Sequence, residues 1–335
     1  MTSLRPNVTK APTDYVAEIG LLIYPQSQLS AIYGLTDLFR IAGDAAEENG
    51  PRNVRVTHWR AERGKPPSCV WESHPASGRG LDYVISPPSI VMPDKMQPMP
   101  VEAAWLQAQY NAGCRVCSIC AGAFVLAESG LLRGRRVTTH WAFAKELAQR
   151  HGDIEVAVRN MVLDDGDIIS AGGILAWTDI GLVLVERLFG RSTMLSTARF
   201  LVIQPPRPTQ LPFTEFVPFF DHGDEAILRV QHHIQEDLTA PLHHKELARI
   251  AKLERRTFIR RFSKATSLNP TEYIQQVRVA KARGILELTN RSLDQVAWEV
   301  GYKDASAFSK IFQRLSGLPV TEYRRQFGIA KGASH

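Results

Sequence analysis

The sequence predicts an α/β sandwich, a parallel β-sheet with helices on both faces, followed by a separate all-helical domain. Short apolar runs alternate with segments of helical periodicity over residues 16–191, which is typical of strands and helices alternating along the chain. A proline-rich stretch then interrupts the pattern, and every later segment has helical periodicity. The chain has 335 residues, too many for one ordinary core, so two domains are expected.

The elements of the first domain follow from apolar runs of strand length and from apolar residues spaced three or four apart. The acidic turn Asp164-Asp-Gly-Asp167 is expected to join two short strands between residues 156 and 171. Strands are expected at residues 19–24, 54–59, 89–92 and 114–119, and helices at residues 29–42, 101–112, 121–130 and 174–188.

Composition sets the expected domain boundaries. The stretch between the domains is rich in proline, which disfavours regular structure and is typical of a linker. Its prolines are Pro205, Pro206, Pro208, Pro212 and Pro218. The expected division is a disordered leader at residues 1–15, the α/β domain at 16–203, the linker at 204–224, the helical domain at 225–328 and a tail at 329–335.

Positive charge is concentrated in the second domain. Residues 226–335 contain 19 Lys and Arg against 10 Asp and Glu, whereas the rest of the chain carries 21 against 24. A basic module on a mildly acidic body favours a nucleic-acid partner, although a solvated charged surface gives the same counts. The sequence contains no run of 18 apolar residues and no apolar signal core, and its four cysteines make no disulfide scaffold. We therefore expect a cytoplasmic protein that does not bind membranes.

The second domain contains a helix-turn-helix pattern near its beginning. Residues 245–251 form a short helix with small and apolar residues on one side, and Leu253 lies in the turn that follows. Residues 254–265 form the second helix, anchored by Phe258 and Phe262 at a spacing of four. The remaining face of this helix is rich in arginine and is left for solvent or a partner.

The same pattern recurs about fifty residues later. Residues 293–315 repeat the two helices, with Gly301 at a turn that suits a left-handed backbone. Phe308 and Phe312 repeat the aromatic spacing. Residues 271–288 predict a long helix that connects the two units and sets the distance between them.

Fixed spacings over some 85 residues carry a resemblance to a known family. They occur in Arg256-Thr-Phe-Ile-Arg-Arg-Phe262, Asn269-Pro-Thr-Glu-Tyr273, Arg278-x-x-x-Ala282-Arg283, Ala297-x-x-x-Gly301-Tyr302, Phe308-Ser-Lys-x-Phe312 and Gly317-Leu-Pro-Val-Thr-Glu-Tyr-Arg324. Through them, residues 242–327 resemble the DNA-binding domain of the AraC/XylS family. One departure is Glu254, where the family usually has a serine helix cap.

The resemblance implies that each second helix enters a major groove of double-stranded DNA, the two lying roughly 34 Å apart on one DNA face. Residues at the family's base-reading positions are Arg256, Ile259, Arg260, Ala305, Ser306, Ser309 and Lys310. Residues better suited to phosphates are Arg255, Arg261, Lys264 and Arg314. For any one arginine, a solvated surface position is the alternative, whereas the four phenylalanines are expected in the core.

The first domain contains a strand–turn–helix with a cysteine at its centre, Ser118-Ile-Cys120-Ala-Gly122. Such a turn holds its central residue in a strained bend at a cleft, and the helix N-terminus favours the thiolate. Val137-Thr-Thr-His140-Trp141 follows about twenty residues later. With Gly34-Leu-Thr-Asp-Leu-Phe-Arg-Ile-Ala42, and Ser170-Ala-Gly-Gly173 with Asp179, these motifs make residues 17–200 resemble the PfpI and class I glutamine amidotransferase-like superfamily, which has a flavodoxin-like fold. Its fusion to the tail resembles the GlxA-type regulators.

Part of the catalytic set of the hydrolytic members is missing here. Their acidic residue beside the cysteine aligns with Ser30-Ala31, and their oxyanion glycine turn aligns with Met92-Pro93-Asp94-Lys95. Proline has no N–H to donate, and an aspartate opposes a developing oxyanion. We therefore expect no catalysis and no cofactor, and instead a small-molecule pocket at the carboxyl ends of the strands, unless Cys120 is purely structural. The expected lining residues are Cys120, Ala121, His140, Trp141, Met92 and Asp94.

The sequence does not favour a metal site at its clustered cysteines. Cys114-x-x-Cys117-x-x-Cys120 has a metal-like spacing, but the first two cysteines fall on a predicted strand and point to opposite faces. Cys69 is remote in the sequence. The pairs His232-His233 and His243-His244 lie at helix edges and are expected at the surface.

The sequence thus predicts a sequence-specific transcription regulator whose first domain dimerises and binds a small metabolite. The expected partners are double-stranded DNA, a second copy of the chain in a homodimer, and an effector for which amino acids and betaines are candidates. RNA polymerase is a further candidate partner, and whether the protein is an activator or a repressor is left open. Two alternatives remain: a cysteine-dependent amidase or hydrolase tethered to DNA, and an architectural protein that binds DNA without sequence preference.

Overall fold

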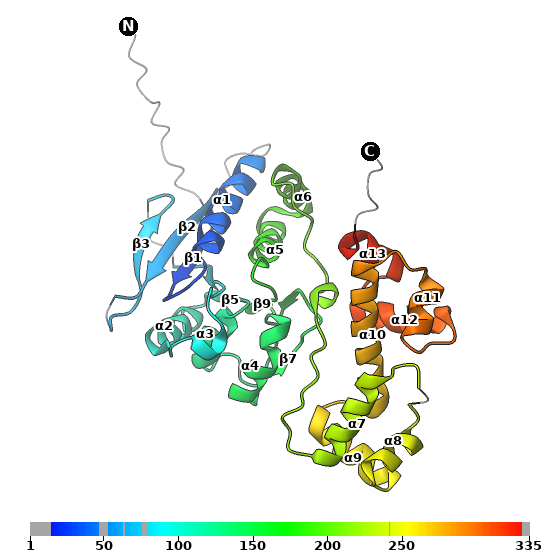
Figure 1. Ribbon diagram of the computed structural model, residues 1–335. Coiled ribbons are helices and arrows are strands. Elements are labelled where there is room, and N and C mark those ends of the chain that lie inside the picture. Colours follow the sequence, from blue (N-terminus) through cyan, green and yellow to red (C-terminus); the bar gives the residue numbers. More distant parts are fainter. Residues whose placement is uncertain (1–14, 47–52, 63, 76–79, 241, 330–335) are drawn as a thin grey trace. The chain divides into compact units, whose positions relative to one another are not determined.

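The computed structural model describes residues 15–46, 53–62, 64–75, 80–240 and 242–329. The chain divides into two compact units, Met1–Gln210 and Leu211–His335, and Figure 1 shows their elements. Apart from Tyr15 and Ile329, the expected leader and tail lie outside the described residues.

The first unit is built around a seven-stranded sheet of order β3-β2-β1-β4-β5-β9-β8 (Figure 1). Its strands are β1 (Tyr15–Ile23), β2 (Asn53–Arg60), β3 (Ser68–Glu72), β4 (Tyr83–Ser86), β5 (Arg115–Ile119), β8 (Val162–Asp164) and β9 (Ile168–Ala171). The five central strands are parallel, and β3 and β8 pair antiparallel at the two edges. Strands β1 and β4 are buried along nearly their whole length, because helices cover a parallel sheet on both faces.

The helices of the first unit form two groups. Helices α1 (Leu29–Ala45), α5 (Trp177–Phe189) and α6 (Arg191–Phe200) contact one another, and α2 (Pro100–Asn111) contacts α3 (Gly122–Glu128). Gly34 on α1 allows the first group to pack closely, because a Cβ there would lie 2.5 Å from the Trp177 ring. A small annex consists of β6 (Arg136–Val137), α4 (Ala144–Arg150) and β7 (Glu155–Val156).

Two strand predictions need correction. The strand expected at residues 89–92 is wrong: the strand in this part of the chain is β4, which was not predicted and which ends at Ser86, before Pro87 and Pro88, which have no N–H for a sheet ladder. Ser89 makes only an isolated bridge to Ser27, and Ile90 is 63% exposed. Strand β3 was not predicted, because every one of its residues is exposed and no apolar alternation marks it.

From Glu225 onward, the described residues of the second unit form helices and no strands, and they enclose two small cores. Its helices are α7 (Glu225–Glu236), α8 (His244–Ala251), α9 (Arg255–Thr266), α10 (Pro270–Leu288), α11 (Leu293–Glu299), α12 (Ala305–Ser316) and α13 (Val320–Phe327). Helix α10 belongs to both cores: Tyr273 and Val277 lie in the first, and Ala282 and Leu286 in the second. The long connecting helix predicted from the sequence therefore joins two helix-turn-helix cores (Figure 1).

The proline-rich stretch has little regular structure, apart from the short turn η4 (Leu211–Phe213), yet it is packed against the protein. On the first-unit side, the Thr209 hydroxyl donates to the Arg159 carbonyl at 2.5 Å. On the second-unit side, the Phe216 ring lies edge-on to Tyr273, with ring centroids 5.4 Å apart. The stretch crosses from one unit to the other between Gln210 and Leu211.

Candidate nucleic-acid interface and effector site

Two phenylalanines fix the second helix of the first helix-turn-helix. Phe258 and Phe262 on α9 are fully buried, and their rings lie 5.5 Å apart at their centroids. Phe262 also packs edge-on against Tyr273 of α10, with a centroid distance of 5.3 Å. Because one face of α9 is held in the core in this way, the opposite face is directed to solvent.

The sequence-predicted residues of α9 divide between these two faces. Arg255, Arg256, Arg260 and Lys264 are exposed, while Ile259 is half-buried and packs against the first core. Four exposed cations on one helix give a strongly positive surface suited to DNA.

Arg261 occupies a different environment from its neighbours. Its guanidinium donates to the Asp224 carboxylate through Nη2 at 2.7 Å and Nε at 2.9 Å. Asp224 is also the N-cap of α7, where it accepts from the Ile227 N–H. Arg261 thus ties α9 to the beginning of α7, and the predicted contact of Arg261 with phosphate would have to share or replace this ion pair.

The second helix-turn-helix repeats the construction with a less charged outer face. Phe308 and Phe312 are fully buried on α12, and Asp304 caps the helix by accepting from the Ser306 and Ala307 N–H groups. The turn before it contains Gly301 with φ +85°, where a Cβ would lie 2.0 Å from the Leu238 carbonyl oxygen. Glycine is required there for both reasons.

The predicted reading residues of α12 lie at its beginning and along its outer face. Ser306, Lys310 and Arg314 are exposed, while Ala305 and Ser309 are half-buried. The Ser309 hydroxyl donates to the Ala305 carbonyl at 2.8 Å, so its oxygen remains an acceptor for a partner. Arg314 donates to the Gln275 side chain at 2.6 Å, which holds it close to α10.

In the first unit, Cys120 occupies the expected strained turn between β5 and α3. Its φ is +55°, which is uncommon for a residue with a side chain. Two residues later, a Cβ on Gly122 would lie 2.4 Å from the carbonyl oxygens of both Ser86 and Pro87. The turn is therefore pressed against the end of β4, with no room for a side chain at residue 122.

The chemical state of Cys120 differs from the sequence-based expectation. Burial raises the pKa of the thiol to about 12, and a hydrogen bond with the Ala121 backbone opposes this only in part. Cys120 is 2% exposed. The helix N-terminus favours the thiolate, but desolvation is the larger effect, so the thiol is neutral at pH 7.

His140 lies in a turn that is hydrogen-bonded to the cysteine turn. The hydroxyl of the preceding Thr139 donates to the Cys120 carbonyl at 2.7 Å. His140 Nδ1 accepts from the Ala142 N–H at 3.1 Å, which leaves the proton of the neutral ring on Nε2. Partial burial lowers the pKa of His140, and Phe143 packs on its ring with centroids 4.8 Å apart.

The other residues expected to line the pocket differ in accessibility. Ala121 is buried beside Cys120, and Trp141 is half-buried beside His140. Met92 and Asp94 are exposed at the turn η2 (Pro93–Lys95). Trp141 and His140 can reach solvent, whereas a ligand could reach Cys120 only if the surrounding turns moved.

Sequence reasoning missed Gln210, which is 1% exposed within the proline-rich stretch. Its Nε2 donates to the Thr139 carbonyl at 2.9 Å and, at longer distances, to Thr138 Oγ1 and the Asn160 carbonyl. Its Oε1 accepts from the Trp141 N–H at 3.0 Å. The side chain of Gln210 therefore binds the turn that carries His140, and no sequence pattern signalled it.

The linker is also anchored next to Gln210. Asp179, at the beginning of α5, is 3% exposed and accepts from the backbone N–H of Arg207 at 2.8 Å. It also accepts from the Arg207 guanidinium through Nη2 and Nε. This buried carboxylate fixes the segment that leads to Gln210.

The clustered cysteines are buried and unbridged. Cys114 and Cys117 are at most 2% exposed, and burial raises the pKa of both. Among the described residues, no three His, Cys, Asp or Glu side chains lie where they could hold one metal ion. No helix of the described part of the chain is long and apolar enough to cross a membrane.

Comparison with known proteins bears on both units. The model of the DJ-1/PfpI family matches residues 81–187, and a helix-turn-helix domain model matches residues 247–326. The HTH-type transcriptional regulator ArgR of Pseudomonas aeruginosa is 25% identical over 95% of this chain and 90% of its own length. The HTH-type transcriptional regulator GbdR of the same species is 26% identical over 66% of this chain, but the match spans only 60% of GbdR.

Isonitrile hydratase of Pseudomonas putida is 30% identical over 60% of this chain and 83% of its own length. Among solved structures, Drosophila melanogaster DJ-1beta has a TM-score of 0.44 at 19% identity, covering 56% of this chain and 98% of that one. The chain therefore belongs to the DJ-1/PfpI family, and it joins such a domain to a helix-turn-helix domain.

Proposed function

We propose that the protein is a sequence-specific DNA-binding transcription regulator controlled by a small metabolite bound in its first unit. The observation that carries this is the pair of helices α9 and α12, each held by two buried phenylalanines and each presenting a polar or cationic face. Two such helices on one connecting helix suit successive major grooves on one face of DNA. The colinear relation to ArgR, a transcriptional regulator, supports the same reading.

Helices α9 and α12 are expected to contribute unequally to base recognition. Arg256 and Arg260 are exposed on α9 and suit guanine, whose O6 and N7 an arginine can bind in bidentate fashion. Ser306 and Lys310 on α12 offer shorter or less directional contacts, and Ala305 can meet a thymine methyl group. The first helix is therefore expected to contribute more of the base discrimination.

The decisive experiment is a binding selection of the full-length protein against fragments of its own genome at fixed moderate salt. Enrichment of a few sites with half-sites about one helical turn apart supports the regulator. The variant Arg256→Ala/Arg260→Ala is the matched comparison, because both side chains are exposed and their loss leaves the phenylalanine core intact. Enrichment no greater than for bulk DNA, with and without amino acids and betaines, contradicts the proposal.

Control by an effector requires a route from the first unit to the second, and we propose that Gln210 begins it. A ligand bound beside His140 and Trp141 would meet the turn of residues 138–141. That turn is bound to Gln210 by hydrogen bonds from both ends of the glutamine amide. The Gln210 side chain is buried, so breaking these hydrogen bonds costs free energy, and a displacement of the turn is expected to displace Gln210 as well.

The next residue along the chain belongs to the second unit. The Leu211 carbonyl accepts from Arg283 Nη2 at 2.9 Å, and the Thr214 carbonyl accepts from the same guanidinium. Arg283 is 9% exposed and lies on α10, the helix shared by both helix-turn-helix cores. Gln210, Leu211 and Arg283 thus connect the His140 turn to the helix that sets the spacing of the reading helices.

One observation favours the enzyme alternative: the isonitrile hydratase of Pseudomonas putida is 30% identical to this chain, and the match spans 83% of the hydratase. Against it stand the buried, neutral thiol of Cys120 and the exposed Asp94 where an oxyanion donor is needed. Turnover of an isonitrile or an amide by the full-length protein, abolished in Cys120→Ala, would establish the enzyme. Equal rates in the wild type and in Cys120→Ala support the regulator.

A second copy of the chain and RNA polymerase complete the proposed partners. A dimer would present four helices of the α9 and α12 type and lengthen the recognised site, which raises specificity because the added helices contact further bases. Analytical ultracentrifugation of the free protein and of its DNA complex measures this directly.

A further inference from the structure

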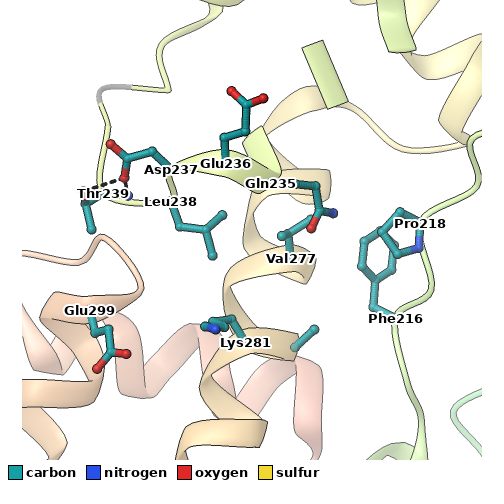
Figure 2. A pocket seen from close by; sticks show the side chains of 11 residues that line it. Phe216, Pro218, Gln235, Glu236, Asp237, Leu238, Thr239, Val277, Lys281 and Glu299 are labelled. Carbon is teal, nitrogen blue, oxygen red and sulfur yellow. Dashed lines mark hydrogen bonds between the residues drawn. The ribbon is translucent and has the colours of Figure 1, made fainter. Parts of the chain in front are cut away.

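The second unit contains two hollows of opposite charge. The first, about 430 Å³, lies between the linker at Phe216, the end of α7, α10 and α11, and Figure 2 shows its side chains. Its wall carries Glu236, Asp237 and Glu299 against a single cation, Lys281. This acidic hollow would repel a DNA backbone.

The second hollow, which we call the interhead groove, is larger and has the opposite charge. Its volume is about 820 Å³, and its cationic lining residues are Lys245, Arg255, Arg278 and Lys303, with His243 and His244 beside them. None of the described residues that line it is an Asp or a Glu. Cations that line a concave surface together, with no acidic residue in the same lining, create a positive potential there.

The interhead groove extends between the beginnings of the two reading helices. Arg255 is the first residue of α9, and Lys303 lies two residues before Ala305, the first residue of α12. Lys245 lies in the first turn of α8. Helix beginnings present free N–H groups and positive dipole ends, which add to the attraction for anions.

Arg278 forms the floor of the groove, and the contacts that hold it do not neutralise its positive charge. Arg278 Nη2 donates to the Leu238 carbonyl at 2.7 Å, and its guanidinium packs on the Tyr302 ring at 5.1 Å. Gly301 completes the floor, because any side chain there would strike Arg278 or Leu238. Among the described residues, no carboxylate forms an ion pair with Arg278, and burial lowers the pKa of its guanidinium, so an anion in the groove would stabilise the charge.

We infer that the interhead groove binds the phosphates of the DNA strand segment between the two half-sites, through Lys245 and Lys303 at its rim and Arg278 at its floor. This inference rests on the proposed function in placing the reading helices in successive major grooves. It adds a contact that is independent of sequence, since phosphates position a duplex but specify no base. The groove therefore contributes affinity and salt dependence, and the reading helices contribute specificity.

The test compares the full-length wild type with Lys245→Gln and Lys303→Gln, and with Lys281→Gln as the matched control from the acidic hollow. All three lysines are exposed, so their substitution leaves the packed core intact, which circular dichroism melting verifies. Affinity for a random-sequence duplex and for a selected site is measured from about 50 to 200 mM salt, because the logarithm of affinity falls linearly with the logarithm of salt for each phosphate contacted.

We expect Lys245→Gln and Lys303→Gln each to flatten the slope of log affinity against log salt by about one, on both duplexes alike. Lys281→Gln should leave this slope unchanged. Slopes in the groove variants equal to that of the wild type overturn the inference, whatever the wild type's sequence preference. A wild type that binds both duplexes equally refutes sequence reading instead. The slopes on random DNA still decide the groove in that case, so the two failures are distinguishable.

Discussion

At Cys120 two effects act in opposite directions on one thiol. The helix that begins after the turn favours the thiolate, and burial favours the neutral form. The pKa of about 12 shows that burial is the larger effect. A strained turn of this kind can therefore be retained for its shape, with the carbonyl of Cys120 holding Thr139, while the sulfur stays unreactive.

We expect Cys120 to resist alkylation. Raising the pKa from 9.0 to about 12 lowers the thiolate fraction at pH 7.5 about a thousandfold. Peptide mass spectrometry after a pulse of iodoacetamide should find Cys69, which is exposed, modified first. Labelling of Cys120 as fast as Cys69 would contradict the buried neutral thiol.

The same shift predicts how stability depends on pH. A thiol whose pKa is raised in the folded state stabilises the fold fully below about pH 9, and this contribution is lost as the pH rises toward 12. Between pH 5 and 8 the thiol remains neutral, so its ionisation should add nothing to the pH dependence of DNA binding.

Gly122 is expected to tolerate no side chain. Gly122→Ala places a Cβ 2.4 Å from two carbonyl oxygens of the backbone, which cannot rotate away as a side chain can. We expect a loss of about 1–3 kcal/mol in the unfolding free energy of the first unit, measured by urea denaturation. Gly173→Ala is the control, because nothing lies within 4 Å of a Cβ there. Equal stability of the two variants would contradict the close contact.

At the scale of elements, the aromatic pairs of α9 and α12 decide which side chains face outward. Each pair buries two phenylalanines four residues apart, and the position between them that is turned to solvent is Arg260 on α9 and Lys310 on α12. Arg261 is half-buried, since Asp224 holds it against α7. The positions next to it remain available for DNA.

The division between reading and positioning residues can be tested on α9 alone. Arg256→Ala should relax the preference at one base pair by about 1–3 kcal/mol, while Lys264→Ala should weaken all sequences alike and flatten the salt slope by about one. A binding selection for each variant, with affinities at two salt concentrations, separates the two effects. The opposite pattern would reverse the assigned roles.

Long elements with strong periodicity were predictable from the sequence, whereas the short strands β3 and β4 were not. The parallel strand β1 and the helix pair α8–α9 are marked by their buried residues. Strand β3 carries no such mark, because all of its residues are exposed. The apolar run at residues 89–92 misled because it follows two prolines and lies outside the sheet.

In the candidate sites, too, local patterns were predictable from the sequence and contacts between distant residues were not. The Cys120 turn and the cations of α9 are local patterns, so the sequence indicates them. Gln210 binds partners about 50 to 70 residues earlier in the chain, and a single glutamine among prolines has no periodicity to reveal it. The protonation of Cys120 also depends on burial by elements remote in sequence, which a local rule about helix ends does not include.

At the scale of the whole molecule, effector control is a coupling between two binding equilibria. An effector that changes DNA affinity by some factor must have its own affinity changed by DNA by the same factor. An amino acid or betaine that raises the melting temperature of the protein is the probe for measuring both. A factor of one for a probe that binds would contradict control by that ligand.

Gln210→Glu should weaken this coupling while both ligands still bind. A carboxylate keeps the acceptor for the Trp141 N–H, but it loses the donor and faces the Thr139 carbonyl with negative charge. We expect the ratio of DNA affinities with and without the probe to approach one, measured by fluorescence anisotropy. Gln204→Glu, exposed in the same segment, serves as the control. An unchanged ratio in Gln210→Glu would remove Gln210 from the route.

The packing of the proline-rich stretch determines where two such proteins can be recombined. A gene fusion cut at residue 224, where the composition changes, would strip the second unit of Phe216 and of the Leu211 and Thr214 carbonyls that bind Arg283. A cut after residue 203 would instead transfer the Gln210 amide away from its own His140 turn. Chimaeras that exchange effector specificity between regulators should therefore be joined between Gln210 and Leu211, where each half keeps every contact it makes with its own unit.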